Sequence, residues 1–346
     1  MKSSMATESP EIPTLAAEAE APPSVRIDGL RRALQQVRLN LALQDYIVFI
    51  GHFLILLRVA FAPDGHDASI ARFEYAALLA VTSASLFLVR SGIVASSYVR
   101  AWIYRGGVLL SLPAAYFTMR HLLPALEPRL LDAELMRIDE WLFFGTTPSV
   151  WLDQHLASYA TVEWFSFCYY LYFILLLLNQ GGTAVFDRGR RQREMMFGTM
   201  LVGFGGYFGY TLVPGLGPYA TLHFAPLSGG FWWSTVSHTV SSAGAQLDIF
   251  PSLHTAQPCF FALHAIRYRR TRPYKWLWVP ATFIALNIVV ATMLLRWHWG
   301  IDVIAGLVLA FLAQRLGIAA SRFEEARARP DRQAVWEQMW GAYDRT

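Results

Sequence analysis

The chain has 346 residues, of which 55% are hydrophobic and only 16% are charged, whereas an average soluble domain carries about 25% charged residues. This composition excludes a disordered chain, a coiled coil and a disulfide scaffold, and it indicates an integral membrane protein of several spans. We attribute the net charge of +4 to arginine-rich cytoplasmic loops and predict no nucleic-acid partner.

The predicted elements begin with a polar N-terminal tail, residues 1–40, which contains a short amphipathic helix over 25–39. Apolar runs of about twenty residues, the length that crosses a bilayer, follow along the chain. We predict about eight transmembrane helices, at 41–62, 72–89, 101–119, 159–179, 195–214, 252–267, 276–295 and 299–318. The predicted fold class is therefore all-α, a polytopic integral membrane helix bundle. Its membrane domain covers 41–320, with the motif region at about 200–310, and a cytoplasmic tail covers 321–346.

Charges in the loops predict the orientation of these helices. Arginines are concentrated at 188–193 and 267–275 and flank a third loop as Arg90 and Arg100, whereas 214–250 contains no Lys or Arg. Cytoplasmic loops carry such an excess of basic residues. With eight spans, every basic loop falls on one side together with both termini. We therefore predict a multi-pass protein of the cell (inner) membrane with both termini in the cytoplasm.

The connection 120–158 is predicted to be external. Its stretch 138–156 is amphipathic and contains Trp141 and Trp151. A helix with one apolar face and aromatic anchors is typical of the membrane interface. We therefore expect an interfacial helix over 138–156.

A first polar cluster opens the predicted helix at 252–267. Pro251 suits the first turn of a helix, and Ser252 and His254 follow it directly. The free backbone N–H groups and the dipole of a helix N-terminus attract anions such as phosphate. Ser252 is a candidate phosphate ligand here, although a serine in this place is equally typical of a helix cap.

A second polar cluster opens the last predicted helix. His298 and Asp302 are four residues apart, so they share one helix face. The carboxylate of Asp302 can then accept the ring N–H of His298 and fix its tautomer. Arg296 is a candidate phosphate ligand, and the alternative is an arginine that reaches for lipid headgroups. The predicted topology places both clusters at the external membrane face.

Two histidines beside a helix N-terminus suit phosphoryl transfer. One imidazole can attack phosphorus, while the other protonates the leaving oxygen and later deprotonates an alcohol or water. No cluster has the spacing of metal ligands, so we predict neither a metal nor a cofactor. Cys168 and Cys259 lie in apolar runs and are interpreted as packing residues.

These motifs resemble the type 2 phosphatidic acid phosphatase superfamily. The run Pro251–His254 matches its Pro-Ser-x-His motif, and His298 with Asp302 matches its His-x3-Asp motif, with Val303 and Gly306 in the usual following positions. The resemblance covers about 200–310. It implies that His298 is the nucleophile that forms a phosphohistidine, that Asp302 orients it, and that His254 is the general acid and base. It also implies that Ser252 contacts a phosphate oxygen.

The chain departs from the superfamily in its cationic motif. Lys-x6-Arg-Pro is absent, since the lysines are Lys2 and Lys275, and Thr292 stands where an arginine is usual. The inositol phosphorylceramide synthase-like branch also lacks the lysine motif and is similar in its Pro-Ser-Leu-His, in a Pro/Gly loop such as 213–219, and in a stretch like 138–145. This resemblance implies an inositolphosphotransferase-like enzyme.

Three functions are compatible with these residues. The leading hypothesis is a membrane phosphotransferase that moves a phospho-headgroup, such as inositol phosphate, from a phospholipid or lipid phosphate to a lipid acceptor in the extracytoplasmic leaflet. A lipid phosphatase acting on phosphatidate or an isoprenoid diphosphate is the close alternative. A haem-binding electron carrier with paired histidines is a distant one, and the membrane-embedded charges are too few to outline a transporter. The sequence does not define an oligomeric state.

Overall fold

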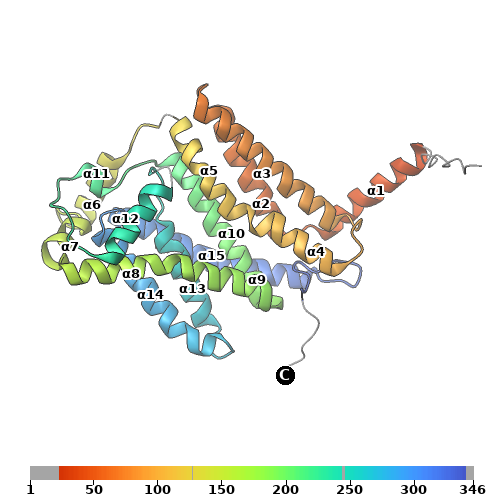
Figure 1. Cartoon of the computed structure of the whole chain (residues 1–346). Helices are drawn as coiled ribbons and strands as arrows, with labels where there is room; N and C mark the ends of the chain where they lie inside the picture. The colour runs from red at the N-terminus through yellow and green to blue at the C-terminus, as the bar shows by residue number, and fades with distance from the viewer. Residues whose placement is uncertain (1–22, 127, 244–245, 340–346) are drawn as a thin grey trace, which may run out of the picture.

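The computed structural model describes residues 23–126, 128–243 and 246–339. It is 76% helical, and its described part contains no strand. The prediction of an all-α membrane bundle is confirmed. Long helices run along the molecule, and short helices gather at one end of it (Figure 1).

The N-terminal third of the chain forms one helical group. It consists of α1 (Pro23–Asn40), α2 (Leu43–Ala60), α3 (His66–Arg90), and α4 (Ser97–Tyr104), which continues through the π-helical turn η1 (Arg105–Leu109) into α5 (Ser111–Ala125). Helix α3 packs between α2 and α5. The amphipathic helix predicted over 25–39 is confirmed as α1.

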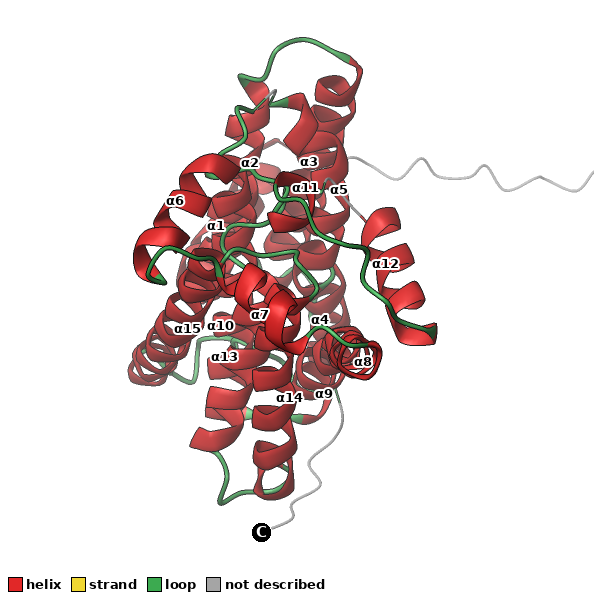
Figure 2. Cartoon of the chain, turned by 90° about the vertical axis from the view of Figure 1, so that its left-hand side faces the viewer, coloured by secondary structure: helices red, strands yellow, loops and turns green. Residues whose placement is uncertain are grey.

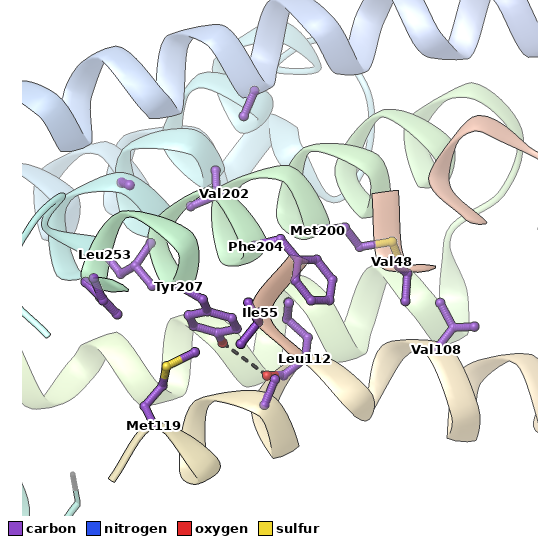
Figure 3. Close-up of a cluster of buried hydrophobic side chains, with 14 of the residues drawn as sticks. Val48, Ile55, Val108, Leu112, Met119, Met200, Val202, Phe204, Tyr207 and Leu253 are labelled. Carbon is purple, nitrogen blue, oxygen red and sulfur yellow. Dashed lines mark hydrogen bonds between the residues drawn. The ribbon is translucent and has the colours of Figure 1, made fainter. Parts of the chain in front are cut away.

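The second group carries the predicted motifs. It consists of α8 (Tyr159–Leu176), continued through η2 (Leu177–Gly181) into α9 (Gly182–Phe186), then α10 (Gly189–Leu212), α13 (Leu253–Arg267), α14 (Tyr274–Leu294) and α15 (Gly300–Ala326). Helix α10 is central, because it packs on α2 and α5 on one side and on α13 and α15 on the other. In the core between the groups, Phe204 and Tyr207 of α10 lie beside Leu112, whose carbonyl accepts the Tyr207 hydroxyl (Figure 3).

Four short helices cover one end of the bundle. They are α6 (Asp132–Leu142), α7 (Pro148–Leu156), α11 (Pro218–Thr221) and α12 (Phe231–Ala243), and Figure 2 looks directly onto them. The continuous helix predicted over 138–156 is wrong. The chain breaks it at Phe144 and Gly145, which have positive φ, and Thr147 then caps a new helix that has Pro148 in its first turn.

The basic loops meet at the opposite end. Glu325 at the end of α15 pairs with Arg190 and Arg193 of α10, and Glu194 pairs with Arg267 at the end of α13. The predicted cytoplasmic tail over 321–346 stays a prediction, and its residues 340–346 lie outside the described part of the chain. Helix α15 continues to Ala326, and the segment that follows packs back on the bundle. Trp336 is buried there and donates its indole N–H to Gln44 at 3.0 Å.

Among the described residues, five helical segments are long and apolar enough to cross a membrane: Leu43–Ala60, His66–Arg90, Tyr159–Phe186, Tyr274–Leu294 and Gly300–Ala326. The other three predicted spans coincide with α4–η1–α5, α10 and α13. A π-helical turn interrupts the first, α10 begins with a charged turn, and α13 has only 15 residues. The count of eight therefore stays a prediction.

Candidate active site

The two predicted motifs are bonded to each other. Ser252 is the N-cap of α13, where its hydroxyl accepts the N–H of Thr255 at 3.3 Å. Its own backbone N–H donates to the carbonyl of Asp302 at 3.0 Å. The structure thus shows the capping role of Ser252, and contact with a phosphate stays a prediction. The bond to Asp302 holds the first turn of α13 against the first turn of α15.

Glycines allow this close approach. A Cβ atom on Gly306 of α15 would lie 2.6 Å from the carbonyl oxygen of Ser252, and one on Gly209 of α10 would lie 2.4 Å from the ring of Pro251. Both distances are too short for a real side chain. The glycines of α10 and α15 therefore allow the Pro-Ser-Leu-His segment to pack between these helices, as expected for close helix packing.

We expect Gly306→Ala to displace the first turn of α13 and to cost about 1–3 kcal/mol of stability, because the new methyl group overpacks a fixed backbone atom. Activity should fall with it. Gly182→Ala in α9 is the matched control, since a Cβ there meets nothing within 4 Å and alanine favours a helix. Thermal unfolding in detergent measures both variants, and equal melting temperatures would contradict the proposed packing.

His298 and Asp302 lie as the spacing predicts. Nδ1 of His298 is 3.4 Å from Oδ2 of Asp302, and both side chains are buried. The same carboxylate oxygen accepts the N–H of Trp299 at 2.9 Å, so that Asp302 also caps α15. Because Nδ1 faces the carboxylate, Nε2 of His298 is the ring nitrogen left for chemistry.

His254 and His298 face a common cavity. Their ring centroids are 6.4 Å apart, and both line a cavity of about 70 Å³ under α12. The imidazole of His254 lies between Tyr169 and Tyr172 of α8, with centroid distances of 4.3 and 4.2 Å. Its Nε2 is buried without a hydrogen-bond partner. A buried polar atom without a partner is costly, so a substrate oxygen is a fitting partner for this nitrogen.

Asp248 also lines this cavity, together with Tyr116 and Tyr219. The hydroxyl of Tyr116 donates to the carboxylate of Asp248 at 3.0 Å. A carboxylate in the cavity wall attracts hydroxyl or ammonium donors. The sequence alone left open whether Asp248 faces the site or solvent.

Two aspartates of α6 hold the loops around the site. Asp139 accepts the N–H groups of Gly300 and Ile301 at 2.6 and 2.8 Å and so caps α15 from outside. Asp132 accepts the N–H groups of Leu216 and Gly217 and the indole N–H of Trp299. Burial raises the pKa of Asp139, although its two backbone donors act in the opposite direction. Neither aspartate carries a signal in the sequence that predicts this role.

Arg296 faces elsewhere. Its guanidinium donates to the carbonyl of Ala225 at 2.8 Å, pairs with Asp153 of α7 and covers the ring of Phe224. It lines a second cavity, which adjoins the first, and not the cavity of the two histidines. Direct binding of the transferred phosphate by Arg296 remains a prediction.

Metal-ligating residue types are scattered. Within the described ranges, no group of three or more His, Cys, Asp or Glu side chains is arranged to hold a metal ion. Cys168 in α8 and Cys259 in α13 are both free.

Two imidazoles lie at the start of two helices of this membrane protein, one of them beside a carboxylate. These are groups that phosphoryl transfer can use. A family model of the PAP2 superfamily matches residues 133–316, which is more than half of the chain. The chain belongs to this superfamily, and it is a phosphatase or phosphotransferase of the type 2 phosphatidic acid phosphatase class that acts on lipid phosphates. Comparisons with curated proteins and with solved structures found no match.

Proposed function

We propose that the protein transfers a phospho-headgroup from a phospholipid donor to a lipid hydroxyl, as in the inositolphosphotransferase-like branch. Nε2 of His298 attacks phosphorus and breaks its bond to the leaving oxygen, which takes a proton from His254. The acceptor hydroxyl then gives a proton to His254 and attacks the phosphohistidine, which restores His298. Asp302 orients His298 throughout.

The shared cavity of His254 and His298 is the observation that carries this proposal. The nucleophile must reach the phosphorus atom in line with the leaving oxygen, and the proton carrier must reach that oxygen on the far side of the atom. Two rings 6.4 Å apart across a cavity leave room for the phosphorus atom between them. The free N–H groups at the start of α13 favour the phosphate charge.

Transfer to an alcohol is favoured over transfer to water by what covers the site. Thr239 and Val240 of α12, with Tyr169 and Trp297, line the cavity, so that most of its wall is apolar or aromatic. Such a cover excludes water and admits a lipid. The missing Lys-x6-Arg-Pro motif agrees with this, because a phosphodiester donor carries less charge than a phosphate monoester and needs fewer cations.

The length of α13 supports access from the membrane. Its 15 residues span about 22 Å, whereas the hydrocarbon core is about 30 Å thick. If the basic end lies at the cytoplasmic surface, the start of α13 stays below the opposite surface. A lipid could then present its head to His254 without leaving the bilayer.

The discriminating assay supplies purified enzyme with phosphatidylinositol labelled in its headgroup, with and without ceramide or a diacylglycerol whose acyl chains differ from those of the donor. We expect a new labelled lipid only when an acceptor is present, and a lower release of free inositol phosphate. Equal release of free headgroup in both cases, with no new lipid, would rule out transfer and leave the phosphatase function standing.

The haem hypothesis loses its support in the structure. A porphyrin bound between His254 and His298 would have to enter the cavity that they share, whose volume is only about 70 Å³. Its simplest check is the absorption spectrum of the purified protein, where we expect no haem band.

The orientation of the site is a proposal that labelling can test. Ser228, near the site end, and Arg270, in the basic loop, are both exposed. We expect a single cysteine at Ser228, in a background without Cys168 and Cys259, to react with an impermeant thiol reagent added to whole cells. Arg270→Cys should react only after the membrane is opened. Labelling of Arg270→Cys from outside would reverse the proposed orientation.

A further inference from the structure

A second cavity adjoins the one between the histidines. It has a volume of about 440 Å³ and is lined by Arg296, Trp233, Ser237 and Leu227, among others. Tyr219, Val240 and Trp297 line both cavities. Trp297 connects the two physically, because its ring contacts Tyr169 at a centroid distance of 4.6 Å and Trp233 at 5.9 Å. A molecule bound in the second cavity would therefore lie next to the cavity of the two histidines.

Two buried polar atoms of residues that line this cavity have no hydrogen-bond partner in the described part of the chain. They are Nε of Arg296 and the hydroxyl of Ser237. Arg296 is only 8% exposed, and its two terminal nitrogens are used by Ala225 and Asp153. The two terminal nitrogens of Arg296 thus hold α7 and the loop at Ala225 in place, which is a structural role. This structural role does not explain why the Nε–H donor of Arg296 and the hydroxyl of Ser237 are buried without a partner, which costs free energy.

The charge of the cavity selects its ligand. The positive charge of Arg296 is already balanced by Asp153, so a second anion would enter without a free cation to stabilise it. Nε–H and a serine hydroxyl instead match the oxygen of a neutral alcohol. Trp233, Trp297 and Leu227 offer the apolar walls that lie beside such a head in a lipid site.

We propose that this second cavity binds the hydroxyl-bearing head of a neutral acceptor lipid, with Arg296 and Ser237 as its polar contacts. For the transfer step the acceptor oxygen leaves these contacts and moves past Trp297 to His254. This inference rests on the proposed transferase function, because a hydrolase needs no such site. It separates the donor, whose phosphate lies between the histidines, from the acceptor.

Helix α12 forms one wall of this cavity and is held in a fixed position. Glu163 of α8 accepts the N–H groups of Gly230, Trp232 and Trp233 at 2.7, 3.1 and 2.9 Å, which fixes the start of α12 against α8. The same helix carries Ser237 and Val240 into the cavity wall and leaves Ser234 exposed outside it. Ser234 is therefore a matched control position on the same helix.

Steady-state kinetics in which donor and acceptor concentrations are varied separately test whether Ser237 binds the acceptor. In Ser237→Ala we expect the KM for diacylglycerol to rise about threefold to tenfold, the value of one lost hydrogen bond. Formation of the phosphohistidine from phosphatidylinositol should be unchanged, and Ser234→Ala should match the wild type in both steps. An unchanged KM for diacylglycerol in Ser237→Ala would overturn the role of Ser237.

A binding test without turnover separates this inference from the proposed function. Ser241 lines the cavity and is exposed, so Ser241→Cys should react with a small thiol reagent in a background without Cys168 and Cys259. With no donor present, dioctanoylglycerol or a short-chain ceramide should slow this labelling, and trioctanoylglycerol, which has no hydroxyl, should not. Ser234→Cys should be unaffected by all three lipids.

Labelling of Ser241→Cys at the same rate with and without both lipid alcohols would overturn the site, whatever the enzyme does in the transfer assay. Equal protection by trioctanoylglycerol would show an unspecific apolar surface and would overturn it too. Protection by the alcohols together with a failed transfer assay would refute the proposed function and leave the lipid-alcohol site in place.

Discussion

Replacement of His298 by alanine is expected to abolish turnover and to remove any phosphoenzyme. Its ring is the only one of the two that pairs with a carboxylate, at 3.4 Å from Asp302, and its Nε2 remains for attack on phosphorus. Without the imidazole no covalent intermediate can form. Brief incubation with labelled donor, rapid quenching in alkali, which preserves phosphohistidine, and electrophoresis measure the intermediate directly. Wild-type turnover in His298→Ala would contradict the mechanism.

Asp302→Asn is the informative companion variant. It keeps the shape of the side chain and an oxygen that can accept the N–H of Trp299, but it weakens the orientation of His298. By analogy with carboxylate–histidine pairs in other enzymes, we expect a loss on the order of 10⁴-fold in kcat with the nucleophile still present. A trace of phosphoenzyme should therefore persist in Asp302→Asn and be absent from His298→Ala. Chelators should affect neither the wild type nor this variant.

The apolar runs of the sequence predicted the bundle well. Each of the eight predicted spans coincides with a helix, because a span of about twenty apolar residues is a strong local signal. The continuous helix over 138–156 was wrong, since a tally of apolar residues does not register the positive φ of Phe144 and Gly145. The sequence did not predict the burial of Trp336, because this burial depends on residues almost three hundred positions earlier in the chain.

The site was predictable where its chemistry is local in sequence. His298 and Asp302 share a helix turn, and the Pro-Ser-Leu-His run marks a helix start. The partners of these residues come from distant helices and left no such signal. Tyr169 and Tyr172 look like apolar membrane residues, and only their spacing of three placed them on one face of α8. Asp139 supports α15 across a separation of 161 residues.

Arg296 shows the limit of proximity in sequence as a guide. It lies two residues before His298, the proposed nucleophile, and the sequence suggested a phosphate contact. Its φ of 67° belongs to the left-handed region, which non-glycine residues adopt rarely. The chain turns there, so that the side chains of Arg296 and His298 line different cavities.

His254→Ala is expected to lower kcat by about 10² to 10⁴-fold, the usual contribution of a general acid and base, through a different step from His298→Ala. Attack by His298 on a donor with a poor leaving group, such as diacylglycerol, needs the proton of His254. A p-nitrophenyl phosphodiester leaves without that proton, so its first step should survive in His254→Ala. The phosphohistidine should then accumulate, because the incoming alcohol has lost its base. Rapid-quench measurement should show a burst of nitrophenol and a slow second phase.

Phe173→Leu is the control for altered packing, because the ring of Phe173 contacts His254 at a centroid distance of 6.4 Å. This variant should slow both steps equally or neither. If His254→Ala failed to form phosphohistidine from the activated donor, His254 would act in binding or folding and the division of roles between the two histidines would be lost.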